Sequence, residues 1–218
     1  MMPAIASKTL SEFGTLSKDD AINITGGEPI LNPHCKTILE IILETNAKIT
    51  FSTNAYEKIE NIELLNLLLC ASRIQIPLDG VNQSSISEFR CDTHNYHEKV
   101  LNFVDVLRTM KFSGIIKFGT VLMGENTKKL NNIFELIKSF KIPNVEWCIY
   151  PFISSDGKYI YPDENKLISL KSHCNNNHIS FKLFNPICRN DKYIFVNPDG
   201  TMTTIRNNVE IPIRIKEK

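Results

Sequence analysis

Short apolar strands that alternate with helical segments are the feature that most limits how this chain can fold. Runs rich in β-branched residues predict strands at 22–25, 48–52, 73–78, 115–123, 145–152 and 178–183. Helical patterns of about 10–15 residues separate most of these strands. Strands joined in this way pair in parallel through right-handed crossovers. The sequence therefore predicts an α/β protein with a parallel sheet, whose ligand-binding edge lies at the carboxyl ends of its strands.

A paired glycine followed by Glu-Pro ends the first predicted strand, in Thr25-Gly26-Gly27-Glu28-Pro29. The two glycines can adopt backbone angles that are closed to other residues, and they let a ligand approach the main chain. Proline favours an extended residue before it, which presents the Glu28 carboxylate near the strand end. A carboxylate beside free backbone N–H groups suits the ammonium group of an amino acid. An ordinary strand-to-helix turn is the alternative for these residues taken alone.

The composition gives no case for a nucleic-acid or membrane partner. With 218 residues, of which 42% are hydrophobic, the chain can bury one sizeable core, and its formal net charge is +1. The apolar runs 38–43 and 64–69 are much shorter than the about 20 residues that a bilayer requires. No charged-then-apolar leader opens the sequence. We therefore expect a cytoplasmic protein.

The cysteines are not spaced for a metal site. They stand at Cys35, Cys70, Cys91, Cys148, Cys174 and Cys188, and no two lie close together in the sequence. A set made of His173, Cys174, His178 and Cys188 matches no tight zinc pattern. In a reducing compartment most of these residues are expected to be buried free thiols. We predict no metal ligands among them.

Five segments, in order between about residues 22 and 126, resemble the motifs of radical S-adenosylmethionine (radical SAM) enzymes. They read ITGGEP, FSTNA, IQIPLDG, SEFRCDTHNYHEKVL and KFGTVLMGEN. The resemblance implies that S-adenosylmethionine is bound by Gly26, Gly27, Glu28, Ser52, Asn54, Asp79, Arg90 and Gly119. For Ser52 and Asn54 the alternative is local hydrogen bonding within a turn. The cluster-binding CxxxCxxC of the family does not occur in these residues.

Two positions depart from the family pattern. Pro77 stands where the family often has a serine whose hydroxyl meets the ribose, so that contact is left to Gln75 and Asp79. Cys91 stands where the family usually has glycine. In relatives with this pattern the arginine at position 90 pairs with the methionine carboxylate, for which a guanidinium is well shaped. The alternative for Arg90 is a surface cation.

The resemblance implies an incomplete, open (β/α) TIM-type barrel over residues 1–153, built from the second to the sixth strands of the family barrel. Residues 154–218 are expected to form a small extension with a helix, the strand at 178–183, a hairpin around Pro198-Asp199-Gly200 and a loosely ordered tail from residue 207. In peptide-modifying relatives a cysteine, a hairpin and a second cysteine bind an auxiliary cluster. No cysteine follows Gly200, so whether Cys188 is a relic of such a site stays open.

The family holds a [4Fe-4S] cluster with three thiolates and uses it to cleave S-adenosylmethionine to a 5′-deoxyadenosyl radical. Our first hypothesis is that this chain is the cofactor-cradling and substrate part of such an enzyme and is inactive alone. Its cluster motif would lie upstream or on another chain, and its substrate would be a small molecule or a peptide. Met1 would then be an internal start, a gene-model boundary or a frameshift remnant.

The second hypothesis is a degenerate, non-catalytic binding module that kept the barrel. An unrelated barrel enzyme such as an aldolase is a third, but no lysine stands at a predicted strand end where a Schiff base would form. A CxxxCxxC motif encoded about 20–30 residues before Ala21 would favour the first hypothesis over the second. In either case the strand 22–25 lacks a neighbour, and we predict that it lies at the sheet edge or pairs with another chain.

Overall fold

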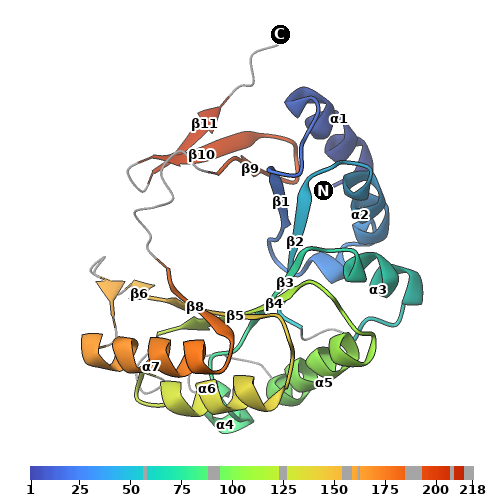
Figure 1. The fold of residues 1–218 in the computed structure, drawn as a ribbon. Helices are drawn as coiled ribbons and strands as arrows, with labels where there is room; N and C mark the ends of the chain where they lie inside the picture. The colour runs from blue at the N-terminus through green and yellow to red at the C-terminus, as the bar shows by residue number, and fades with distance from the viewer. Residues whose placement is uncertain are drawn as a thin grey trace.

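The computed structural model describes residues 1–55, 58–87, 94–122, 127–153, 159–161, 163–184, 193–206 and 209–213. Its main sheet contains, in spatial order, β1 (Ala21–Ile24), β2 (Lys48–Ser52), β3 (Arg73–Pro77), β4 (Ile115–Val121), β5 (Val145–Tyr150) and β8 (Ile179–Leu183). Each strand pairs in parallel with its neighbour. The sheet curls into an open arc (Figure 1). This is the incomplete, open barrel that the sequence predicts.

The structure confirms the prediction for one edge of the sheet and differs from it at the other. β1 lies at one edge, as the sequence predicts, and Pro77 is the last residue of β3, where its missing N–H breaks no ladder. At the other edge, β8 was expected as a strand of the C-terminal extension. It pairs with β5 instead, so the parallel sheet has six strands and continues beyond residue 153.

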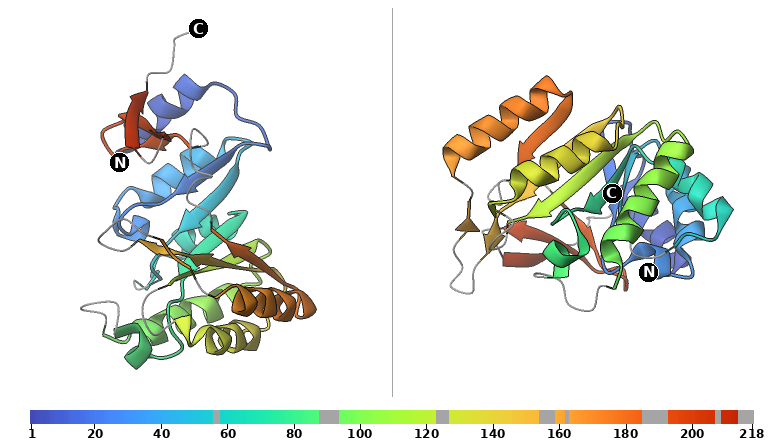
Figure 2. Two further views of the ribbon diagram at one scale, coloured as in Figure 1. Left: turned by 90° about the vertical axis from the view of Figure 1, so that its left-hand side faces the viewer. Right: turned by 90° about the horizontal axis from the view of Figure 1, so that it is seen from below.

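The helices cover the convex side of the arc (Figures 1 and 2). They are α1 (Pro3–Phe13), α2 (Cys35–Leu43), α3 (Ile62–Leu69), α4 (Gln83–Ser87), α5 (Tyr96–Thr109), α6 (Leu130–Ser139) and α7 (Glu164–Asn176), with a 3-10 turn η1 (Pro29–Leu31) after β1. Side-chain caps begin several of these helices. Asn61 accepts from the backbone of Glu63 and Leu64 at the start of α3, and Asp163 accepts from Lys166 at the start of α7.

The core lies between the sheet and these helices. On β2, β3 and the first half of β4, buried residues alternate with half-exposed ones, because successive side chains of a strand point to opposite faces. Phe51, Phe118 and Trp147 are among the largest fully buried side chains. The Trp147 indole donates to the Thr120 hydroxyl at 2.9 Å, which donates to the Leu78 carbonyl at 2.7 Å. Trp147 is therefore core packing, with its one polar group satisfied.

The C-terminal residues form a separate antiparallel sheet in the order β11 (Val209–Ile213), β10 (Met202–Arg206) and β9 (Phe195–Val196). The sequence predicts the β9–β10 hairpin, but the expectation of a loosely ordered tail from residue 207 is wrong for β11. Val209, Ile211 and Ile213 alternate with Glu210 and Pro212, a pattern that an edge strand tolerates.

The short sheet lies across the open side of the arc (Figure 1), and its turn reaches α1. A Cβ placed on Gly200 would lie 3.1 Å from the Ile5 side chain. A second small ladder pairs β6 (Phe152–Ile153) with β7 (Tyr159–Ile160). Among the described residues, no helix has the length and apolar character that crossing a membrane requires.

Candidate functional site

The turn after β1 is the open end of the candidate site. Gly26 and Gly27 have positive φ angles of 94° and 54°, which other residues rarely adopt. A Cβ built on either glycine would meet nothing within 4 Å. Glu28 follows in the extended conformation, with φ −124° and ψ 108°, as a residue before proline should. The turn leaves the main chain open to a ligand beside the end of β1.

Glu28 is held in place by groups from two strand exits. Its Oε1 atom accepts from the Ile30 backbone at 3.2 Å and from the Thr53 hydroxyl at 2.9 Å, and its Oε2 atom accepts from the Asn54 backbone at 2.6 Å. A carboxylate has about four acceptor positions, and the described residues fill three of them. The sequence placed Glu28 at this edge, but it did not indicate that Thr53, which is buried, fixes the carboxylate.

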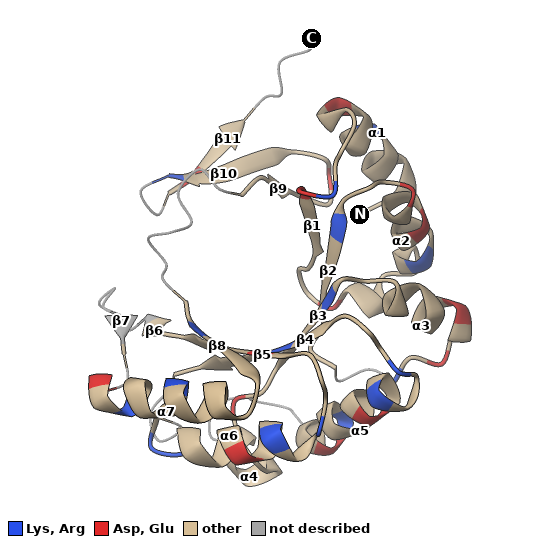
Figure 3. Cartoon of the chain, viewed as in Figure 1, with Lys and Arg blue, Asp and Glu red and all other residues tan. Residues whose placement is uncertain are grey.

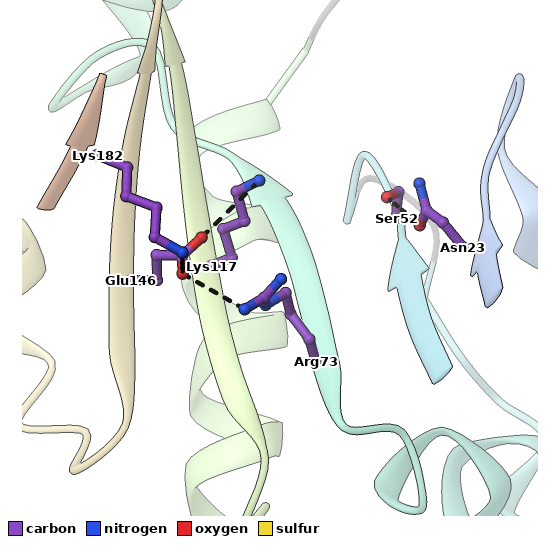
Figure 4. Close-up of polar contacts among 6 residues, drawn as sticks. All are labelled: Asn23, Ser52, Arg73, Lys117, Glu146 and Lys182. Atoms are coloured by element: carbon purple, nitrogen blue, oxygen red, sulfur yellow. Dashed lines mark hydrogen bonds and ion pairs between the residues drawn. The ribbon is translucent and has the colours of Figure 1, made fainter. Parts of the chain in front are cut away.

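Ser52 lies next to this anchor, on the concave face. Its hydroxyl donates to the Asn23 side chain at 3.1 Å, which joins the ends of β1 and β2 (Figure 4). Asn23 was not predicted as a site residue. Its place between Ile22 and Ile24 was the available signal, because alternation puts the one polar side chain opposite the two apolar ones. Asn54 contributes its backbone N–H to the site through Glu28.

Asp79 and Gly119 lie at the exits of β3 and β4 and organise them. The Asp79 carboxylate is buried and accepts from the Val121 backbone at 2.8 Å, while the Leu78 backbone donates to the Gly119 carbonyl at 2.8 Å. A Cβ on Gly119 would lie 3.1 Å from the Tyr150 ring. Gly119 thus makes room for an aromatic side chain on the neighbouring strand. From the sequence, Gly119 was expected to allow the close approach of a ligand to the backbone.

Of the predicted site residues, the structure therefore brings together Gly26, Gly27, Glu28, Ser52 and Asn54 at the exits of β1 and β2. Asp79 and Gly119 form a second group at the exits of β3 and β4. Arg90 lies outside the described residues, as do Cys91 and Cys188. Whether Arg90 binds a carboxylate stays a prediction.

The described cysteines do not fit an iron–sulfur cluster. Cys35 begins α2, Cys70 ends α3, Cys148 lies in β5 and Cys174 lies in α7, and all four are free thiols. Across the described ranges, no three His, Cys, Asp or Glu side chains are close enough to hold a metal ion. Burial raises the pKa of Cys35 to about 11, with a further contribution from the negative charge of Glu28. Such a thiol resists the deprotonation that metal binding requires.

We expect that this chain, reconstituted anaerobically with iron and sulfide, binds no stoichiometric [4Fe-4S] cluster. The reason is that a cluster loop gathers several thiolates at short spacing, and the six cysteines do not provide that spacing. Iron analysis and the visible absorption spectrum are the measurements. A brown protein with about four irons per chain, whose colour is lost in Cys188→Ala, would contradict the expectation.

A cluster of charged side chains lies on the concave face of the strands (Figures 3 and 4). The Glu146 carboxylate on β5 is 2.6 Å from Lys182 Nζ, 3.4 Å from Arg73 Nη2 and 3.9 Å from Lys117 Nζ. The Glu146 side chain is 5% exposed, against 15% for Lys117, 31% for Arg73 and 55% for Lys182. Burial lowers the pKa of Lys117, and the positive charges of its two cationic neighbours act in the same direction.

The sequence analysis did not identify this cluster. The available signal was a single charged residue in each of three apolar strands: Arg73 in RIQIP, Lys117 in IIKFGTV and Glu146 in VEWCIY. Charged residues are almost never buried without a partner, so each marked a position that faces something polar. Which strands are neighbours, and hence which charges meet, was visible only in the folded chain.

Comparisons with known proteins identify the family of the chain. The sequence profile of the Radical SAM superfamily matches residues 9–137, which is more than half of the 218 residues. The chain belongs to the radical SAM superfamily. No curated protein sequence is significantly similar to it. The resemblance of the five motifs is thereby confirmed at the level of the family.

Solved structures of radical SAM proteins share the fold at low sequence identity. A domain of the pyruvate-formate lyase-activating enzyme from Bacteroides vulgatus superimposes with a TM-score of 0.59 and 16% identity, covering 76% of this chain and 99% of that domain. SuiB of Streptococcus suis, bound to precursor peptide SuiA, superimposes with a TM-score of 0.63 and 14% identity and covers 85% of this chain. The protein anSMEcpe, bound to AdoMet and the Cp18Cys peptide, superimposes with a TM-score of 0.61 and 16% identity and covers 83% of this chain. The chain spans 42% of SuiB and 55% of anSMEcpe.

Proposed function

We propose that this radical SAM chain is the part of an enzyme that binds S-adenosylmethionine and a substrate, with the cluster ligands carried outside these 218 residues. The observation that carries the proposal is the turn at Gly26 and Gly27, which is open above the main chain and stands beside a fixed carboxylate. S-adenosylmethionine, when bound in such an enzyme, supplies the radical that removes a substrate hydrogen.

The residues at the exits of β1 and β2 support the binding of the methionine end. Among the described residues Glu28 has one acceptor position left for an ammonium group, and its three hydrogen bonds keep the carboxylate in place before any ligand arrives. The described cysteines do not fit the cluster. The contribution of this chain is therefore to position the ligand and to hold the substrate against the concave face of the sheet.

A peptide is the substrate class that we propose. SuiB and anSMEcpe, which share this fold, were solved with peptides bound. The present chain covers only part of either protein. The concave face of its sheet is not covered by helices (Figure 1), and it carries the charged cluster (Figure 4). Such a face suits the amide and side-chain groups of a peptide better than an apolar molecule.

We predict that the isolated chain binds S-adenosylmethionine weakly, with a dissociation constant on the order of 1 mM or higher. Without iron to chelate the amino and carboxylate groups, what remains is a few charge-assisted hydrogen bonds of roughly 1.5–3 kcal/mol each, before the cost of immobilising the ligand. A constant of 1 mM corresponds to about −4.1 kcal/mol. Calorimetry, with amide chemical shifts of Gly26 and Gly27 as the local readout, tests this.

Glu28→Gln is the informative variant. Alanine at this position would also leave the Thr53 hydroxyl and the Asn54 backbone N–H without their acceptor, and so would confuse binding with stability. Glutamine keeps one of the two acceptor oxygens, replaces the other by an NH2 group and removes the charge, and binding should fall by about tenfold or more. Glu40→Gln, at an exposed position on α2, is the matched control. Micromolar affinity, or binding that does not depend on Glu28, would show that the site is wrongly placed.

A degenerate binding module is the second candidate. The observation that favours it is the set of three hydrogen bonds that Glu28 accepts from within the chain, because they give the residue a structural role without any ligand. Complete absence of S-adenosylmethionine binding in the wild-type chain would support this candidate. Binding that Glu28→Gln weakens would support the enzyme part.

A further inference from the structure

Two donors of the charged cluster have no hydrogen-bond acceptor within the described part of the chain. The Arg73 Nε atom is buried and without a partner, although its Nη2 atom pairs with Glu146. The Lys117 ammonium lies 3.9 Å from Glu146, which is an ion pair but is too long for a hydrogen bond. Lys117 is otherwise 5.5 Å from the centre of the Tyr150 ring. Both donors stand on the concave face, and the buried Arg73 Nε is costly to leave without an acceptor.

The charges of the cluster do not balance. Three cations, Arg73, Lys117 and Lys182, surround the one carboxylate of Glu146, which leaves an excess of two positive charges. Like charges at this separation repel one another, most strongly where burial reduces solvent screening. The lowered pKa of Lys117 has burial as its main cause and agrees with such repulsion. A second negative group beside the cations would relieve it.

The rest of the concave face is also polar, which is unusual for the inside of a barrel. Closed TIM barrels fill this space with layers of bulky apolar side chains. Here the strand register places Thr50 beside Arg73 and Gln75 beside Lys117 on the face opposite the buried core. Lys182 is half-exposed, so the cluster can be reached from solvent. A face that keeps donors and charge excess in place of apolar packing is suited to a polar, anionic ligand.

We propose that Arg73, Lys117 and Lys182 bind a carboxylate of the substrate, so that the substrate is a peptide with an acidic side chain at the position held by β3, β4 and β8. The peptide class rests on the proposed function, whereas the acidic side chain rests on the cluster itself. Glu146 acts as a positioning residue that holds the cations in one place. The guanidinium and the ammonium donors then bind the incoming carboxylate through charge-assisted hydrogen bonds.

The cluster lies across the sheet from the Gly26–Gly27 turn. The turn follows β1 at one edge, whereas the cluster residues come from β3, β4, β5 and β8. Lys117 and Glu146 are in register with Ser52, and Lys182 is in register with Gly119. The carboxylate of the substrate would therefore lie farther along the sheet than the methionine end of S-adenosylmethionine at the turn, and the two could be bound together.

The test uses the whole chain and two capped tripeptides, acetyl-Ala-Glu-Ala-amide and acetyl-Ala-Gln-Ala-amide, titrated into isotopically labelled protein and followed by amide chemical shifts. We expect the acidic peptide to bind at least about tenfold more tightly than its amide analogue. Lys117→Met and Lys182→Met should each remove that preference. Lys182 is half-exposed, so its variant stays informative even where Lys117→Met folds poorly. Lys48→Met, an exposed lysine at the start of β2, is the matched control and should keep the preference.

Four results would overturn the inference: equal binding of the two peptides, an equal loss in Lys48→Met, tighter binding of inorganic phosphate than of the acidic peptide, or competition between the peptide and S-adenosylmethionine. The last would assign the cluster to the cofactor. These outcomes are separable from the proposed function. If S-adenosylmethionine binds and the acidic peptide does not, only the present inference fails. If the reverse holds, the anion site stands and the proposed function fails.

Discussion

At pH 11 the folded chain should be about 5 kcal/mol less stable than at pH 8, because two buried thiols keep their protons in the folded state and lose them on unfolding. Burial raises the pKa of Cys174 to about 12 and, together with the charge of Glu28, raises that of Cys35 to about 11, from an ordinary value of 9.0. Their side chains are almost fully buried. A domain of this kind has a total stability of only about 5–15 kcal/mol, so alkaline unfolding should result.

The sign follows from proton counting. Between pH 9 and 11 the folded state binds more protons than the unfolded state, so the free energy of unfolding falls as the pH rises, by roughly 1.4 kcal/mol per pH unit for each thiol. Burial also raises the pKa of Cys148, which acts in the same direction. Burial lowers the pKa of Lys117 below 10.5, so its own contribution rises with pH up to that value. These last two groups are neighbours and partly cancel.

Urea unfolding at several pH values, with a non-thiol reductant present, measures this dependence. The double variant Cys35→Ala, Cys174→Ala should lose most of the slope above pH 9, although cavity formation will lower its stability at neutral pH. Cys70→Ala is the matched control, because Cys70 is exposed, and it should keep the wild-type slope. A flat profile in the wild-type chain would mean that these thiols are not shielded from solvent as the structure has them.

Most elements of the main sheet and its helices were predictable because they have a local signal. The helix at Pro3–Phe13 has a glycine stop, and the strand at Lys48–Ser52 alternates apolar and polar residues, and both are found at those residues. The β11 strand was missed because the residues from 207 onward were interpreted as a loosely ordered tail. Pro212 is compatible with an edge strand, but whether it is tolerated depends on which side of the strand has a neighbour. The pairing of β8 with β5 in the parallel sheet was missed because periodicity predicts a strand but does not identify its partner.

Part of the candidate site was also predictable from the sequence, and part was not. Gly26, Gly27 and Glu28 were predictable because a tight turn needs residues of particular conformational freedom, and the structure has the positive φ angles that this requires. The anchoring of Glu28 by Thr53 and Asn54 joins two strand exits that lie about 25 residues apart, so no local pattern carries it. The charged cluster likewise gathers side chains from four strands, of which each alone looks like an isolated surface charge.

Glu146→Ala should lower the free energy of unfolding by about 3 kcal/mol. Removing one partner of a buried ion pair typically costs about 3–5 kcal/mol, because the remaining charge is left uncompensated away from water. Lys117 is the group that suffers most, since it is largely buried, whereas Lys182 can turn toward solvent. The lower end of the range is therefore expected. Urea denaturation of the variant beside the wild-type chain gives the number.

A double-mutant cycle identifies which cation is responsible. The cost of Glu146→Ala is expected to come from the unpaired Lys117 ammonium. If so, the double variant Glu146→Ala, Lys117→Met should lose about 1–2 kcal/mol less unfolding free energy than the two single variants lose together. The same cycle with Lys182→Met should recover much less, because that ammonium is already half in water. The unfolding free energy of Glu146→Gln should lie between those of the wild type and Glu146→Ala, because the amide oxygen still accepts a hydrogen bond. Equal recovery in the two cycles would show that Lys117 is no more shielded than Lys182, and the charge excess on the concave face would then be screened by solvent in the free protein.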